Sequence, residues 1–381
     1  MTPRQVGRVV RARIRVLRAE AGGGIAMSFA PLTHRTCVLV ELESDDGVVG
    51  HGESWVNYPA WAHEERVATL RDGVLPLVLG RHASDVRGVQ AELAATLDPL
   101  GRQWGAPGPI RQALSGVDIA LWDLWGRTTG RSIAELAGGR TRDEIAVYAS
   151  SLGPSDVTRQ AAACRDAGHR AVKVKVGFGR ENDERALLDA RNVLGDVALY
   201  ADANQAWSLD EAVGLAAMLR EHGIVWLEEP VRGDRVTDLE RLHQRTGMAI
   251  ATGENVYGID AFRTVVDSPG VAVVQPDLTK AGGVTEALEV CALARRTGTV
   301  VNPHLYGGAV GYAATLQLAA HAAVVGTVEY DIRDNPLRDP LLRDPPTPRD
   351  GAVALPSGPG IGVDLDADAA DGRTLSVMTV A

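Results

Sequence analysis

The sequence predicts an α/β protein, namely a (β/α)8-type barrel with an N-terminal α+β capping domain that the C-terminal segment completes. From about residue 144, short β-like runs alternate with helix-like runs, and eight β-like runs can be distinguished. Eight β/α repeats are typical of a closed barrel. An open doubly wound sheet has the same local rhythm, but the number of repeats favours the barrel. The runs are EIAVYAS, AVKVKV, ALYADAN, VWLEEP, AIATGEN, VAVVQPD, TVVNPH and TVEYD.

The first 140 residues have a different pattern, which predicts a separate capping domain over 1–140. A strand is expected in RVVRARIRVLR, and a hairpin in RTCVLVELES and GVVGHGES around a D-D-G turn. Helical periodicity follows at 62–79, 85–97 and 110–128. The barrel is then expected over 141–334.

The C-terminal residues 335–381 begin with a stretch rich in proline and glycine. Apolar residues persist in VALP and IGVDLD, so we expect an ordered segment that returns to the capping domain. A disordered tail is the alternative.

Composition excludes several classes of function. The chain has 381 residues, 45% of them hydrophobic and 23% charged, as in ordinary soluble domains. A net charge of −10 argues against nucleic acid and anionic membrane as partners. No apolar run is long enough for a membrane span. The three cysteines are far apart and have no metal-like spacing, so we expect a cytoplasmic protein.

Ionisable and amide residues recur at the predicted carboxyl ends of the strands, where barrel enzymes carry their chemistry. One β/α repeat separates each group from the next, so we expect the groups to surround a single mouth. The residues are Lys173, Lys175, Asp202, Asn204, Glu228, Glu229, Glu254, Asn255, Asp277, His304, Glu329 and Asp331.

Three of these residues, Asp202, Glu228 and Glu254, are carboxylates on successive strands. Such like charges raise one another's pKa unless a cation compensates them. Carboxylate oxygens suit Mg²⁺, with Mn²⁺ possible, so the sequence predicts a divalent metal site. A helix cap or salt bridge would explain one such carboxylate, but three at matched positions favour the metal.

The stretch A-V-K-V-K-V at 171–176 places Lys173 and Lys175 on the same face of a strand. Two surface lysines would need an edge strand, which a closed barrel lacks. We expect the lysines to face the carboxylates, and their mutual repulsion to lower the pKa of one until it acts as a base.

On the other side of the mouth, Asp277 is expected to orient His304 as a second base. Glu329 is expected to stay protonated and to donate a hydrogen bond to a developing oxyanion. A metal and two bases predict an enzyme that removes the proton α to a carboxylate and stabilises the resulting enediolate.

In its motifs the chain resembles the enolase superfamily, and within it the mandelate racemase group. The resemblance rests on K-V-K, D-A-N, W-L-E-E-P, G-E-N, Q-P-D-L-T-K-A-G-G-V-T-E-A, N-P-H and V-E-Y in this order. It covers nearly the whole chain, including the late P-G-I-G-V.

The resemblance implies Mg²⁺ ligation by Asp202, Glu228 and Glu254, with Lys175 and His304–Asp277 as the acid/base groups. It implies that Lys173 binds the substrate carboxylate and lowers the pKa of its neighbour, and that Glu329 donates to the enediolate. Asn204 and Lys280 match positions near the site, and Asn204 is assigned to substrate binding. Self-association is also expected, because relatives commonly form homo-oligomers.

Specificity in such proteins comes from two loops of the cap, here about 20–34 and 53–64. The second offers Trp55 and Tyr58 as substrate-binding residues, although these aromatics could instead simply pack the cap on the barrel. Asp331 could bind a substrate ammonium or hydroxyl, but a helix-capping or surface role is the expectation.

Several functions stay open. Racemisation or epimerisation and the elimination of water share the first proton abstraction, and the sequence does not separate them. A muconate-type cycloisomerase would carry a lysine where Asp277 stands, and Lys280 lies three residues further on. A non-catalytic barrel would not need the complete set of ligands and bases. The substrate is expected to be a small carboxylate.

Overall fold

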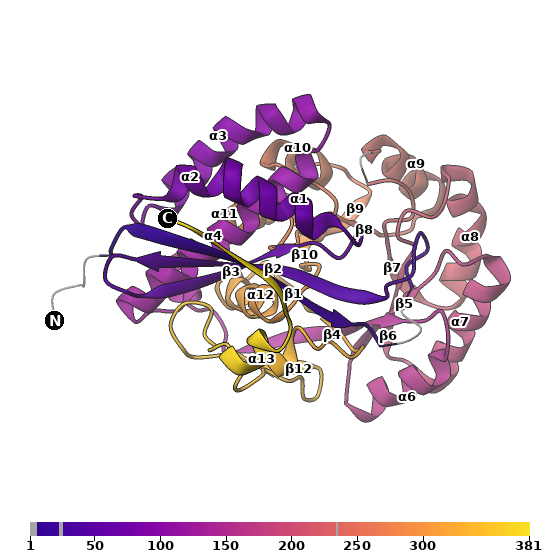
Figure 1. The fold of residues 1–381 in the computed structure, drawn as a ribbon. Helices are drawn as coiled ribbons and strands as arrows, with labels where there is room; N and C mark the ends of the chain where they lie inside the picture. The colour runs from indigo at the N-terminus through magenta and orange to yellow at the C-terminus, as the bar shows by residue number, and fades with distance from the viewer. Residues whose placement is uncertain (1–5, 23–25, 234) are drawn as a thin grey trace.

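The computed structural model describes residues 6–22, 26–233 and 235–381, and within them eight parallel strands form a barrel (Figure 1). Strands adjacent in the chain pair from β4 to β10, and β11 joins β4. The ring closes where Val301 of β10 bridges to Val325, just before β11. The prediction of a closed barrel is therefore confirmed. The strands are β4 (Glu144–Leu152), β5 (Ala171–Lys175), β6 (Ala198–Asp202), β7 (Ile224–Glu228), β8 (Ile250–Thr252), β9 (Val271–Val274), β10 (Val300–Val301) and β11 (Val328–Asp331).

A helix follows each barrel strand except the last, as the sequence predicts, and these helices form the outer layer in Figure 1. Local signals set some of their ends; for example, Ser208 and Glu211 form a reciprocal capping box at the start of α8. The helices are α6 (Val157–Asp166), α7 (Arg180–Leu194), α8 (Leu209–Glu221), α9 (Val236–Thr246), α10 (Ile259–Val266), α11 (Gly283–Thr297) and α12 (Ala309–His321).

The capping domain is an antiparallel sheet of order β13-β1-β2-β3 with helices against it. Its hairpin turns at D-D-G, where Gly47 adopts a φ of 77° that other residues rarely tolerate. The helix predicted at 85–97 continues to Trp104 and includes Pro99. The elements are β1 (Val9–Glu20), β2 (His34–Ser44), β3 (Val49–Trp55), α1 (Ala62–Ala68), η1 (Thr69–Val74), α2 (Leu75–Val78), α3 (Val86–Trp104), α4 (Pro107–Thr129) and α5 (Ile133–Ala137).

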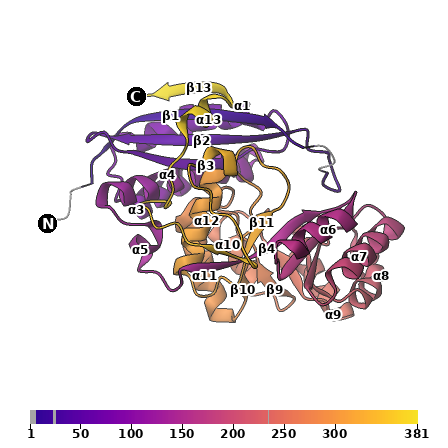
Figure 2. The ribbon, with the colours of Figure 1, turned by 90° about the horizontal axis from the view of Figure 1, so that it is seen from below.

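The C-terminal segment is ordered and returns to the cap. It passes η2 (Asp339–Leu341), β12 (Ala352–Ala354), which pairs with β4, and α13 (Ala367–Asp371). Strand β13 (Thr374–Val380) then pairs antiparallel with β1. Figure 2 shows this strand in yellow on the outer side of the indigo cap sheet, with the barrel beyond.

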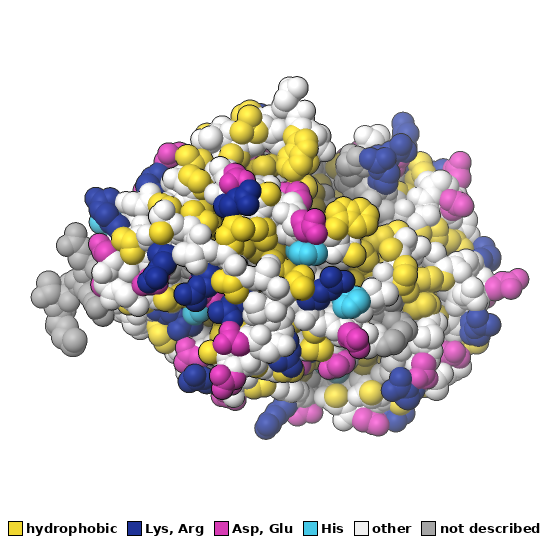
Figure 3. Space-filling view, in the orientation of Figure 1, with side chains coloured by type: hydrophobic (Ala, Val, Ile, Leu, Met, Phe, Trp, Pro, Cys, Tyr) yellow, Lys and Arg dark blue, Asp and Glu magenta, His cyan; other side chains and the backbone are white. Residues whose placement is uncertain are grey.

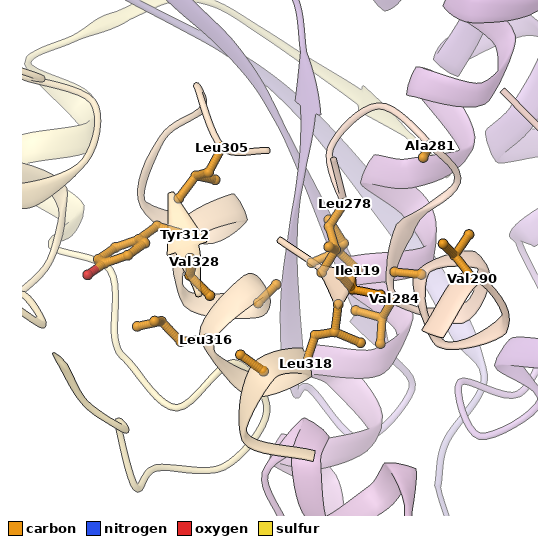
Figure 4. Close-up of a cluster of buried hydrophobic side chains, with 14 of the residues drawn as sticks. Ile119, Leu278, Ala281, Val284, Val290, Leu305, Tyr312, Leu316, Leu318 and Val328 are labelled. Atoms are coloured by element: carbon orange, nitrogen blue, oxygen red, sulfur yellow. The ribbon is translucent and has the colours of Figure 1, made fainter. Parts of the chain in front are cut away.

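The cap is joined to the barrel by a buried apolar layer. Figure 4 shows Ile119 of α4 beside Leu278, which precedes α11, and Val284 at the start of α11, with Leu318 of α12 next to them. The Trp122 indole also donates to Thr285 Oγ1 at 2.9 Å. Helix α4 therefore holds the cap above the carboxyl ends of the strands, where the predicted site lies.

The surface carries charges of both signs interspersed on the face shown in Figure 3, without a broad basic area there. Among the described residues, no helix combines the length and the apolar composition that a membrane crossing requires. The three cysteines are free and buried.

Candidate active site

The strand ends bring the predicted residues together. Lys175, Asp202 and Glu228 are the last residues of β5, β6 and β7, and the parallel register places them side by side. Glu329 lies within β11 rather than after it. Glu254, Asp277 and His304 follow β8, β9 and β10 by two or three residues, and all these side chains are buried.

The two lysines are held by carboxylates. Lys173 is fully buried, and its Nζ lies 2.7 Å from Glu228 Oε2 and 2.8 Å from Glu329 Oε1. Lys175 Nζ lies 2.5 Å from Asp202 Oδ2 and donates to Asn204 Oδ1 at 2.9 Å. Carboxylates from β6, β7 and β11 therefore explain how two ammonium groups can share one face of β5.

The expected lowering of a lysine pKa is wrong for this arrangement. Burial acts to lower the pKa of Lys175, and Lys173 adds to that effect. The carboxylates of Asp202 and Glu228 outweigh both, so the pKa of Lys175 is raised. Lys173 likewise has a pKa well above its usual value, since burial is outweighed by Glu228 and Glu329.

Glu329 is also not the protonated donor that we expected. Burial acts to raise its pKa, but the adjacent Lys173 ammonium outweighs burial and lowers the pKa to about 2. Its Oε1 accepts a hydrogen bond from Ser150, and its Oε2 accepts one from the backbone N–H of Leu305 at 3.0 Å. Glu329 is therefore an ionised acceptor in this structure.

His304 bridges two carboxylates. Its Nδ1 lies 2.7 Å from Asp277 Oδ2, and its Nε2 lies 2.5 Å from Glu254 Oε2. Burial disfavours the imidazolium, but Glu254 and Glu329 outweigh it and raise the pKa of His304 well above its usual value. The predicted Asp277–His304 contact is present.

The three predicted metal ligands converge on the mouth, but each contacts a cation of the protein. Burial and the nearby Asp202 charge raise the pKa of Glu228 to about 8, despite Lys173. Among the described residues, no three carboxylate, imidazole or thiol groups are already arranged around one point as metal ligands. The donor set nevertheless fits Mg²⁺, because a divalent cation is what three buried, mutually repelling carboxylates need in order to ionise together.

A cavity of about 840 Å³ lies at the mouth, between cap and barrel. Trp55 and Tyr58 line it from the second predicted loop, and Met27 and Phe29 line it from the first. Residues 23–25 of that first loop lie outside the described residues. The barrel contributes Lys175, Asn204, Glu254, Lys280, His304 and Glu329 to the lining.

Lys280 is buried beneath the cap. Its Nζ lies 4.5 Å from the centre of the Trp55 ring and donates to Asn255 Oδ1 at 2.8 Å. Asn255 Nδ2 in turn donates to Glu254 and Glu229. Lys280 therefore links the cap to the residue that follows Glu254.

Sequence reasoning missed Gln275 and Tyr306. Gln275 Nε2 donates to Glu228 Oε2 at 2.8 Å, and Tyr306 lines the cavity. Each lies two residues from a predicted site residue, Asp277 or His304, in the loop that follows the same strand, so nearness in the chain was the available signal.

Asp331 has neither a surface role nor a place in the cavity lining. It is 2% exposed and forms an ion pair with Arg35 of β2, with Oδ2 and Nη2 2.6 Å apart. The pair joins the cap sheet to β11, so the expected helix-capping or surface role is wrong.

Together the barrel, the cap and the buried ring of strand-end residues define a candidate acid–base site under a capping domain. Residues 11–138 match the model of the mandelate racemase/muconate lactonizing enzyme N-terminal domain, and residues 156–369 match that of the enolase C-terminal domain-like family. The chain therefore belongs to the mandelate racemase/muconate lactonizing enzyme family of the enolase superfamily.

Similar proteins of known name include isomerases and lyases. The chain is 33% identical to D-galactarolactone cycloisomerase of Agrobacterium fabrum, over 88% of this chain and 90% of that protein. It is 32% identical to a putative L-rhamnonate dehydratase of Caldivirga maquilingensis, over 87% of this chain and 81% of that protein.

Solved structures show the same fold. A mandelate racemase/muconate lactonizing enzyme from Bordetella bronchiseptica is 36% identical with a TM-score of 0.87, covering 97% of this chain and 99% of that chain. A racemase from Streptomyces coelicolor with bound magnesium is 26% identical with a TM-score of 0.87. The match covers 96% of this chain and 100% of that chain.

Proposed function

We propose that this chain removes the proton α to the carboxylate of a small hydroxy acid, and that loss of a β-oxygen substituent or reprotonation follows. One observation carries the proposal: Lys175 and His304 line the same cavity from strands on different sides of the ring. Two acid–base groups facing one cavity can take a proton and return one to the same substrate.

The protein's own residues account for the proton movements. Lys175 would take the α-proton in its neutral form, which requires that the charges of Asp202 and Glu228, which raise its pKa in this structure, be compensated. Asn204 fixes its amine through the 2.9 Å hydrogen bond. His304 keeps Nδ1 on Asp277, so Nε2 is the nitrogen that exchanges a proton with the substrate. In an elimination, the Cα–H bond breaks toward Lys175, and the departing β-oxygen takes a proton from His304. Lys173 is assigned to the substrate carboxylate. Glu329 would donate a hydrogen bond to the enediolate only after it takes up a proton, because its carboxyl group is ionised in this structure.

Asp202, Glu228 and Glu254 would hold Mg²⁺, and Gln275 fixes Glu228 from beside it. When bound, the metal supplies Lewis acidity toward the substrate carboxylate. Mn²⁺ would suit the same oxygen donors.

Elimination is the preferred second step, because acid-sugar dehydratases are prominent among the similar proteins. Cycloisomerisation is a second candidate, since two relatives are named for it. In a lactone or anhydro ring the departing oxygen stays attached through the ring, so the same two proton transfers suffice. A one-base, muconate-type reaction is disfavoured, because Asp277 occupies the position of its lysine and is bound to His304.

The cavity suits a small-molecule substrate. Its volume of about 840 Å³ lies in the range of small-molecule sites, and Trp55 and Tyr58 are assigned to substrate contact on the cap side. We further place the protein in the cytoplasm, in keeping with its free buried cysteines, and expect it to act as a homo-oligomer.

The test is proton NMR in D₂O with Mg²⁺ and a panel of galactarate, D-galactarolactone, L-rhamnonate, D-xylonate and simple α-hydroxy acids. A new 2-keto acid signal identifies dehydration, and a ring-opened product from the lactone identifies cycloisomerisation. Loss of an α-proton signal without a new skeleton identifies racemisation or epimerisation. Absence of both exchange and Mg²⁺ binding would overturn the proposal.

A further inference from the structure

The carboxylate of Glu53, in the capping domain, lies at the start of barrel helix α12. The proposed proton transfers do not use this carboxylate. Glu53, in β3, is fully buried. Its Oε1 accepts a hydrogen bond from the backbone N–H of Gly308 at 2.5 Å, and its Oε2 accepts one from Gly311 at 2.8 Å. Gly308 is the residue before α12, so the cap supplies the N-terminal capping group of this helix.

The backbone around this carboxylate leaves no spare room. A Cβ at Gly307 would lie 2.7 Å from Glu53 Oε1, and a Cβ at Gly308 would lie 3.1 Å from Oε2. A Cβ at Gly311 would lie 2.5 Å from the methyl group of Thr279. The H-L-Y-G-G-A-V-G segment therefore lets the chain after His304 approach the cap closely.

Glu53 fixes one end of the segment that carries His304. Only three residues separate His304 from Gly308, and Leu305 N–H is bonded to Glu329 at 3.0 Å. The segment is thus held by Glu329 from the barrel and by Glu53 from the cap.

The same strand also reaches the partner of His304. Trp55 N–H donates to Thr279 O at 3.2 Å, and Thr279 donates from its N–H and Oγ1 to Asp277 Oδ1 at 2.7 and 2.6 Å. Glu53 and Trp55 lie two residues apart on β3. One cap strand therefore contacts both the segment that carries the imidazole and the segment that carries its carboxylate.

We propose that Glu53 is a positioning residue, through which the docked cap sets the place of the His304 imidazole relative to Asp277. This inference rests on the proposed function, in which His304 is one of the two proton-transfer groups. Packing alone does not account for a glutamate at this position. Burial raises the pKa of Glu53 to about 7, although the hydrogen bonds from the N–H groups of Gly308 and Gly311 act to lower it. An apolar residue of similar volume would fill the space without a buried charge.

The test compares Glu53→Gln with Asp123→Asn. Glutamine keeps the volume but turns one acceptor into a donor that faces an N–H group. Asp123 is the control, because it is a fully buried cap carboxylate outside the cavity lining that accepts from the N–H groups of Ile361 and His51, both at 2.8 Å. It differs from Glu53 in that it is also paired with Arg127 at 2.8 Å.

The first readout needs no substrate. The imidazole proton between His304 and Asp277 is assigned in the NMR spectrum as the downfield signal that is lost in His304→Asn. We expect Glu53→Gln to shift or broaden this signal and Asp123→Asn to leave it in place. An unmoved signal in Glu53→Gln overturns the inference.

The second readout is α-proton exchange with the panel named above, followed separately for each epimer. Glu53→Gln should slow exchange at the His304 face by about tenfold or more, since small misplacements cost large factors. Exchange at the Lys175 face should change far less, and Asp123→Asn should keep the ratio of the two. Equal loss of exchange at both faces overturns the positioning role of Glu53 but leaves the proposed function standing. A wild-type protein that shows neither α-proton exchange nor Mg²⁺ binding overturns the proposed function.

If Glu53→Gln does not fold, Glu53→Asp takes its place, because it keeps the charge and shortens the side chain by one methylene. A shifted imidazole signal with selective loss at the His304 face then supports the inference. An unmoved signal, or equal loss at both faces, overturns it.

Discussion

Nδ1 of His304 lies 2.7 Å from Oδ2 of Asp277, and this contact fixes which imidazole nitrogen faces the cavity. Thr279 holds the other carboxylate oxygen of Asp277 with two hydrogen bonds, so the carboxylate cannot rotate freely. The pair is therefore set before any substrate enters, which is the condition for fast proton transfer.

Replacing His304 by Asn should abolish proton transfer at one face of the substrate only. The expected loss is about 100-fold or more for one epimer, measured as α-proton exchange in D₂O. Lys175→Met is the matched variant and should remove exchange at the opposite face. If each variant slows both epimers equally, the two groups do not face the substrate from opposite sides.

Glu228→Gln should weaken Mg²⁺ binding by about tenfold or more, measured by titration calorimetry, because one charged ligand is lost. Turnover should fall with it. Glu211→Gln, at an exposed helix start, is the control and should bind the metal normally. Unchanged affinity in Glu228→Gln would show that the metal ligands are wrongly assigned.

Asp118 should make stability depend on pH. Its Oδ1 accepts from Thr285 N–H at 3.0 Å, and burial raises its pKa from 3.8 to about 7. The folded chain therefore binds a proton that the unfolded chain has released, so this contribution to stability is present below pH 3.8 and is lost as pH rises through about 7.

Urea unfolding of wild type and Asp118→Asn, at about pH 6 and about pH 8, tests this linkage. The free energy of unfolding of the wild type should fall relative to the variant at the higher pH, by up to about 1.4 kcal/mol per pH unit. The same difference between the two proteins at both pH values would contradict the raised pKa.

The Arg35–Asp331 pair should tie the cap to the barrel. Asp331→Asn leaves a buried guanidinium without its counter-ion and should lower the free energy of unfolding by about 3 kcal/mol in denaturant titrations. The double variant Arg35→Met/Asp331→Leu should recover most of that loss, since no unpaired charge remains. A loss as large in the double variant would mean that packing, not charge, holds this junction.

The repeat pattern of the sequence predicts much of the site. Lys175, Asp202 and Glu228 end successive strands, and parallel pairing places strand ends in one row, so their proximity follows from chain order alone. The contact of Asp277 with His304 follows in the same way, from two adjacent strands.

The electrostatics could not be predicted in this way. The sequence shows Lys173 beside Lys175 and therefore suggests repulsion and a lowered pKa. The folded chain places Glu228 and Glu329 against Lys173 from two other strands, and attraction at under 3 Å outweighs a like charge further away. The same contact keeps Glu329 ionised, and Asp331 finds Arg35, which lies 296 residues earlier in the chain.

The sequence by itself determined the barrel, the cap, the family and the list of ionisable groups, because these depend on local periodicity and on the order of repeats. Only the tertiary structure decided the partner of each group, and hence its charge. Pairings such as Glu53 with Gly308 join segments that no local pattern relates, and the energy of a buried charge depends on the few groups within hydrogen-bond distance.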